Sequence, residues 1–210
     1  YVGETFSRAS IPLMTSVSAG SINAAHLAAD PAPLPARTAR LTAYWEELTQ
    51  DDVFTPRSLW TIGRSLFRNT PTAEQTLLDT APLRAYLDRC LPTDADGCLT
   101  GVADNLDEDR LEGLAISTSN YATLQTVTWL QGCSMTDWER PNRRGRRTRL
   151  SLDHVMASTA LPMVFPAVHL GDAWYGDGGL RMLDPLAPAI HMGADRLFVI
   201  STRYERSQAE

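Results

Sequence analysis

The chain has 210 residues, and its 25 acidic and 19 basic residues give a formal net charge of −6. Every basic residue is an arginine, which excludes chemistry that needs a lysine: a Schiff base with pyridoxal phosphate, a Walker A loop and a Ser–Lys dyad. The length predicts a single domain with a real core, and the acidic balance disfavours a partner made of nucleic acid.

The predicted elements alternate between strands and helices. A strand over 11–15 is followed by helices over 19–29, 38–48, 56–67, 82–90 and 99–110. A hairpin over 114–118 and 123–130, a helix over 152–158, a strand pair over 166–170 and 173–175, a helix over 185–192 and a buried strand over 196–201 complete the order. Residues 30–36 are expected to be a stiff connector, and 138–149, rich in arginine, a solvated loop. This order predicts an α/β layered fold with a partly parallel sheet.

Metal, redox and membrane-spanning functions find little support in the sequence. Cys90, Cys98 and Cys133 form no CxxC pair, and the four histidines lack metal-binding spacing, so we expect no metal and no cofactor. No apolar run approaches the ~20 residues of a membrane span, and no signal peptide stands at Tyr1. These features favour the cytoplasm and leave a secreted or effector-like protein as the alternative.

A nucleophile candidate stands between the first predicted strand and the next helix. Ser18 lies at this junction, with Gly20 two residues later and Ser16 where the pattern G-x-S-x-G has its first glycine. Such a nucleophile elbow presents the serine in a cleft, and its small flanking residues let strand and helix approach closely. The first amides of the helix, beginning with Ala19, would face an oxyanion. The alternative is an ordinary βα turn with a serine cap.

A candidate general base lies far along the chain, in Trp174-Tyr-Gly-Asp-Gly-Gly-Leu180. The glycines around Asp177 permit positive φ and close backbone approach, and leave the carboxylate free to enter a cleft. A carboxylate held against a serine hydroxyl can take its proton. The alternative is an Asp-Gly hairpin turn.

Taken together, these segments resemble the patatin-like phospholipases. Ser16-Val-Ser-Ala-Gly-Ser-Ile-Asn-Ala24 resembles the elbow of that family, Asp177-Gly-Gly179 its Asp-Gly-Gly/Ala motif, and Ala157-Ser-Thr-Ala-Leu-Pro-Met-Val-Phe-Pro166 a segment between them. The stretch Tyr44-Trp-Glu-Glu-Leu-Thr-Gln-Asp-Asp-Val-Phe54 resembles the bacterial branch. The order of motifs fits from about residue 11 to residue 201.

The resemblance implies a three-layer α/β/α sandwich with a mostly parallel central sheet, and hydrolysis of lipid esters, often phospholipids. Ser18 would be the nucleophile and Asp177 the general base, without a catalytic histidine. Ala19 and Gly20 would support the oxyanion, and Ser16, Gly178 and Gly179 would complete the motifs. The implied partner is a lipid ester substrate, with room for transient contact with a membrane surface.

The sequence departs from the family pattern in two places. The family's Gly-rich oxyanion loop is not found before Ser18, so we expect the chain to be truncated at the N-terminus. Ser16 replaces a glycine. Two alternatives therefore stay open: a catalytically silent member that binds lipid or a partner, and a Ser-Asp-His esterase that uses Ser18, Asp177 and His191.

Overall fold

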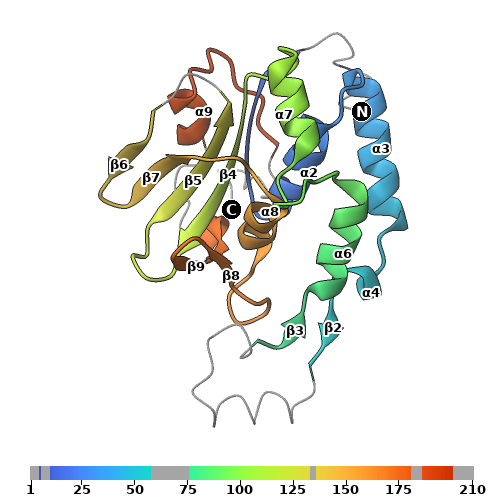
Figure 1. Ribbon diagram of the computed structural model, residues 1–210, viewed down its shortest axis with the longest axis vertical. Helices are drawn as coiled ribbons and strands as arrows, with labels where there is room; N and C mark the ends of the chain where they lie inside the picture. The colour runs from blue at the N-terminus through green and yellow to red at the C-terminus, as the bar shows by residue number, and fades with distance from the viewer. Residues whose placement is uncertain (1–4, 6–9, 58–75, 133–135, 181–185, 201–210) are drawn as a thin grey trace, which may run out of the picture.

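The computed structural model describes residues 5, 10–57, 76–132, 136–180 and 186–200. A mixed sheet forms its centre, with α2, α7 and α8 on one face and α9 on the other (Figure 1). This arrangement confirms the expected α/β layered fold. Within these described residues, no helix combines the length and the apolar character needed to cross a bilayer.

Seven strands form the main sheet. They are β1 (Leu13–Val17), β4 (Gly113–Asn120), β5 (Thr126–Gly132), β6 (Trp138–Arg140), β7 (Arg143–Arg147), β8 (Val168–Leu170) and β9 (Ala173–Asp177). Strands β1 and β4 are parallel, as are β5 and β7, whereas the other pairs are antiparallel. The sheet is therefore mixed rather than mostly parallel, because short turns join β4 to β5, β6 to β7 and β8 to β9.

The helices lie close to the positions expected from the sequence. They are α2 (Ala19–Ala29), α3 (Leu34–Glu47), α4 (Gln50–Val53), α6 (Ala81–Cys90), α7 (Thr100–Asp107), α8 (Leu152–Thr159) and α9 (Ala187–His191), with a 3₁₀ turn, η2, at Gly178–Leu180. Helix α3 begins four residues before the predicted start, because Pro35 fits its first turn. The connector after Asp30 is correspondingly shorter than predicted.

Two sequence predictions are wrong in the described residues. The expected loop over 138–149 contains the β6–β7 hairpin, whose charged side chains suit the edge of a sheet. The expected buried strand after Arg196 is absent through Ile200, and its apolar side chains are 40–75% exposed. Of the helix predicted over 56–67, only Pro56 and Arg57 are described, and Pro56 belongs to a short ribbon of β2 (Thr55–Pro56) and β3 (Leu78–Asp79).

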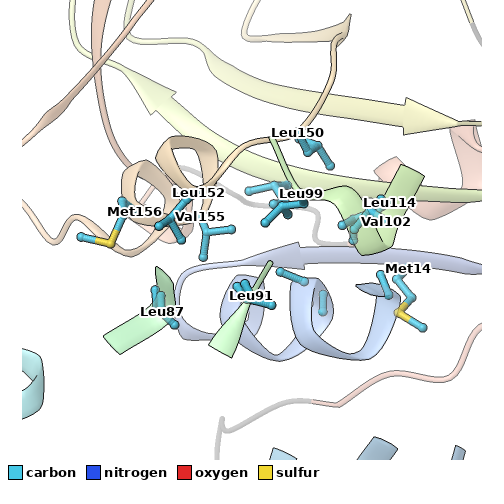
Figure 2. Packing of buried hydrophobic residues seen from close by; sticks show 14 of the residues in the cluster. Met14, Leu87, Leu91, Leu99, Val102, Leu114, Leu150, Leu152, Val155 and Met156 are labelled. Atoms are coloured by element: carbon cyan, nitrogen blue, oxygen red, sulfur yellow. The ribbon is translucent and has the colours of Figure 1, made fainter. Parts of the chain in front are cut away.

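The main core surrounds α2. Figure 2 shows Leu87 of α6, Leu91 just after that helix and Val155 of α8 converging on α2 and on the sheet. Ala25 and Ala28 are fully buried, so small residues let the neighbouring helices approach α2 closely. A Cβ at Gly101 of α7 would lie 2.4 Å from the carbonyl oxygen of Ala29. The helix that begins after Ser18 is thus held from several sides.

Candidate active site

Two strands that are far apart in sequence end at the same place on β4. Strand β1 runs parallel to β4 until Val17 pairs with Ser117. Strand β9 runs antiparallel to β4 and ends with Asp177 opposite Thr118. Because Ser117 and Thr118 are adjacent, the residues at the ends of β1 and β9 meet. The register of β4 therefore brings the predicted nucleophile and the predicted base together.

Ser18 occupies a strained turn between β1 and α2. Its φ is 55° and its ψ is −139°, a backbone conformation that residues other than glycine rarely adopt. Its hydroxyl donates a hydrogen bond of 2.5 Å to Oδ2 of Asp177. The sharp strand–turn–helix expected of a nucleophile elbow is present, and the serine side chain faces the carboxylate. Such strain, about 1–3 kcal/mol, is found where a site needs a side chain in a particular direction.

Ser158 on α8 holds this turn in place. Its buried hydroxyl donates to the carbonyl oxygen of Ser117 at 2.8 Å and accepts the backbone N–H of Ser18 at 3.0 Å. It also lies 2.8 Å from the hydroxyl of Ser21, which is therefore placed to donate to it. Sequence reasoning assigned no role to Ser158, although the residue belongs to the stretch over 157–166 that carries the resemblance.

Asp177 is buried, with 2% of its surface exposed, and both carboxylate oxygens are engaged. Oδ2 accepts from Ser18, and Oδ1 accepts from the backbone N–H of Gly179 at 2.7 Å. Its own N–H donates to the carbonyl oxygen of Ala160 at 2.8 Å, and its carbonyl oxygen accepts from Ser119 at 2.9 Å. These contacts fix the carboxylate with one oxygen toward the serine hydroxyl. Asp177 lies at a strand end and not in a hairpin turn.

The glycines beside Asp177 are needed for close approach and not for positive φ. A Cβ at Gly178 would lie 2.4 Å from the backbone oxygen of Ser117, and one at Gly176 would lie 2.1 Å from the hydroxyl of Tyr121. None of Gly176, Gly178 and Gly179 has a positive φ. Burial and the nearby charge of Asp177 raise the pKa of Tyr121, which places a neutral phenol beside the carboxylate.

The other elbow positions differ in part from the expectation. A Cβ at Gly20 would meet no atom of the described residues within 4 Å, so close approach of strand and helix does not explain this glycine. Open space instead lies beside the first turn of α2, whose N–H groups, at Ala19 and Gly20, have no partner within the helix. The hydroxyl of Ser16 donates to the carbonyl oxygen of Ala115 at 3.1 Å. A serine is thus accommodated where the usual motif has glycine.

None of the four histidines is brought to this pair. His191 lies at the end of α9 against Trp138 of β6, with ring centroids 5.0 Å apart. His26 packs against Tyr44 at 4.8 Å, and burial lowers its pKa. His154 caps α8, and burial lowers its pKa to about 4. His169 contacts Trp174 within the β8–β9 hairpin. The structure therefore does not bring His191 to Ser18 and Asp177, as the Ser-Asp-His alternative requires.

The arginine cluster lies at the β6–β7 edge and is extensively paired. Arg144 contacts Glu139 at 2.7 Å, Arg146 contacts Asp137 at 3.1 Å, and Arg149 contacts Asp94 at 2.6 Å. These pairs agree with a solvated surface. Within the described ranges, no three His, Cys, Asp or Glu side chains converge into a group that could hold a metal ion. Cys133 lies outside the described residues.

Comparison with known proteins agrees with this geometry. No curated protein matches the chain. The family model of the patatin-like phospholipases matches residues 8–190, a range that contains both Ser18 and Asp177. This range covers most of the 210 residues. The chain therefore belongs to the patatin-like phospholipase family, whose general activity is the hydrolysis of acyl esters of lipids.

Proposed function

We propose that this chain hydrolyses carboxylic esters of lipids, phospholipids or lysophospholipids among them, through a Ser18–Asp177 dyad and an acyl-enzyme. The observation that carries the proposal is the 2.5 Å hydrogen bond from the Ser18 hydroxyl to Oδ2 of a buried Asp177. A serine hydroxyl is a weak nucleophile until a neighbouring base accepts its proton. The strained backbone of Ser18 and membership of the family support the same assignment.

In the proposed reaction, Ser18 Oγ attacks the ester carbonyl carbon while its proton moves to Oδ2 of Asp177. The carbonyl oxygen gains negative charge and lies beside the first-turn N–H groups of α2, whose dipole favours an anion. Asp177 then returns the proton to the leaving alcohol as the ester bond breaks. Asp177 next takes a proton from water, the resulting hydroxide attacks the acyl carbon, and Asp177 returns the proton to Ser18 Oγ as its bond to the acyl group breaks and the fatty acid leaves.

The backbone around the dyad supports this division of roles. Gly179 holds Oδ1, so Oδ2 remains directed at the serine hydroxyl. The N–H of Ser18 is already used by Ser158 and is not available to an oxyanion. Among the described residues of this turn, the first-turn amides of α2 are free to serve as donors, and we place the acyl group beside Gly20, where a Cβ would meet nothing within 4 Å.

The experiment that tests the proposal is labelling with a fluorophosphonate probe, with the modified residue located by mass spectrometry. We expect a single adduct on Ser18 in the wild-type protein, and its loss in Ser18→Ala and Asp177→Asn. His191→Ala, remote from the pair, is the matched control and should label at the wild-type rate. A folded protein that does not label would favour the catalytically silent alternative, and loss of labelling in His191→Ala would favour the triad.

A further inference from the structure

The turn after α8 exposes large apolar side chains. Met163 is 82% exposed and Leu161 is 42% exposed. Leu77, on the neighbouring segment, is 55% exposed, and its N–H donates to the carbonyl oxygen of Met163 at 3.4 Å. The N–H of Leu78 donates to the carbonyl oxygen of Val164 at 3.1 Å. Backbone hydrogen bonds thus join the two segments, and we call the three exposed side chains that they carry, Leu77, Leu161 and Met163, the apolar rim.

The apolar rim adjoins the candidate dyad. It begins at Leu161, one residue after Ala160, whose carbonyl oxygen accepts the N–H of Asp177 at 2.8 Å. At the other end of the turn, Phe165 contacts Phe54 with ring centroids 6.2 Å apart. Figure 1 shows this loop between α8 and β8, beside the β2–β3 ribbon and away from α9. The turn is therefore anchored on both sides while its apolar side chains face solvent.

The backbone at the exposed Met163 is strained. The N–H of Val164 donates to the carbonyl oxygen of Leu161 at 3.2 Å across Pro162 and Met163, and Met163 has a φ of 66°. Proline followed by a positive φ is the pattern of a type II turn, in which glycine is preferred at the second position. A methionine there is strained and also exposes apolar surface to water. An apolar side chain that is both exposed and held in a strained conformation is typical of a site of interaction.

We propose that the apolar rim docks on the surface of a lipid aggregate and so presents the dyad to esters at that surface. The inference rests on the proposed function, because the ester substrates of a lipid acyl hydrolase gather in bilayers and micelles. Two observations favour lipid over a protein partner. The three side chains carry no charge, and the turn that bears two of them begins directly after Ala160, whose carbonyl oxygen accepts the N–H of Asp177. The paired arginines of β6–β7 lie at another edge of the sheet and are not part of this surface.

The test measures binding of the full chain to phosphatidylcholine vesicles by sedimentation, in the Ser18→Ala background so that the lipid stays intact. Met163→Gly is the most informative variant, because it relieves the positive φ while removing the side chain. We expect it to bind about tenfold more weakly while its melting temperature stays equal or rises. Leu161→Ser combined with Leu77→Ser should weaken binding further. Ile190→Ser, which changes a 59% exposed side chain on α9, is the matched control and should bind as before.

Activity gives a second, independent readout in proteins that retain Ser18. We expect Met163→Gly to lower the ratio of vesicle hydrolysis to soluble short-chain ester hydrolysis by about tenfold. Vesicle binding that survives replacement of all three rim residues overturns the inference. Binding that disappears in high salt and does not depend on the rim also overturns it, because an apolar surface is insensitive to screening. Failure to cleave the soluble ester would count against the proposed function, whereas rim-dependent vesicle binding would still support docking.

Discussion

The two halves of the candidate dyad are built in opposite ways. On the nucleophile side the backbone is strained and the surroundings are open: Ser18 has a φ of 55°, and a side chain at Gly20 would meet nothing within 4 Å. On the base side the backbone is relaxed and the surroundings are crowded, since a side chain at Gly178 would collide with the backbone of Ser117.

The glycines in the two motifs therefore serve different purposes. Near Asp177 they allow the chain to lie directly against β4, which fixes the carboxylate. Near Ser18 the glycine leaves space beside the first-turn amides, where the proposed reaction places the substrate. Helix α8 connects the two sides, because Ser158 holds Ser18 and Ala160 holds the N–H of Asp177.

The largest effect on stability is expected for Gly178→Ala. The added methyl group would lie 2.4 Å from the carbonyl oxygen of Ser117, a backbone atom in a central strand that cannot move away cheaply. We expect the free energy of unfolding to fall by about 3 kcal/mol or more, with loss of hydrolysis. Urea denaturation of the variant measures the change. A variant that unfolds at the same urea concentration as the wild-type protein would contradict the steric crowding inferred around Gly178.

A change of pH should weaken the helix that joins the two sides. Burial lowers the pKa of His154 from 6.5 to about 4 in the folded protein. As the pH falls from about 6.5 toward 4, the unfolded chain binds a proton that the folded chain does not, so folding stability falls. The total loss is on the order of 3 kcal/mol.

The matched variant for this prediction is His154→Gln. Ser151 donates its N–H to Nδ1 of His154 in a capping box, and glutamine at the same position can keep that box without titrating. We expect the wild-type protein to lose more stability than the variant between pH 7 and pH 4. Urea denaturation at pH 7 and at pH 4 measures the two losses. If the wild-type protein and the variant lose the same free energy of unfolding between these pH values, the role given to His154 is contradicted.

Ser158→Ala should affect the nucleophile side more than Ser119→Ala affects the base side. The first change leaves the N–H of Ser18 and the carbonyl oxygen of Ser117 without their partner, whereas the second removes one bond to the carbonyl oxygen of Asp177. We expect losses of about 2 and about 1 kcal/mol in the free energy of unfolding. Fluorophosphonate labelling should slow markedly only in Ser158→Ala. The reverse order would contradict the comparison.

The smallest effect is expected for Gly20→Ala. The added methyl group meets no neighbour, and alanine is the better helix former, so the protein should become more stable by about 0.5 kcal/mol. The same methyl group narrows the space beside the first-turn amides, and we expect slower hydrolysis of long-chain than of short-chain esters. Thermal denaturation and a chain-length series measure both effects. A large destabilisation would mean that the nucleophile side is as crowded as the base side.

Much of the local structure could be predicted from the sequence. The residues of α2 are those predicted, because a run of small helix-forming residues follows a sharp turn. The β-branched residues of β4 and β5 likewise predicted a hairpin. Both members of the candidate dyad were also found from their short motifs, since a nucleophile elbow and a glycine-flanked aspartate are local patterns.

The local elements, and Ser18 and Asp177 as candidate site residues, therefore follow from the sequence alone. Tertiary structure decided how they meet, because only the pairing register of β4 places the ends of β1 and β9 side by side. It also revealed Ser158, the extended arginine hairpin and the exposed Met163, none of which follows from a neighbouring pattern. Strand register, burial and the space around a glycine depend on atoms contributed by distant segments, so they emerge only when the chain has folded.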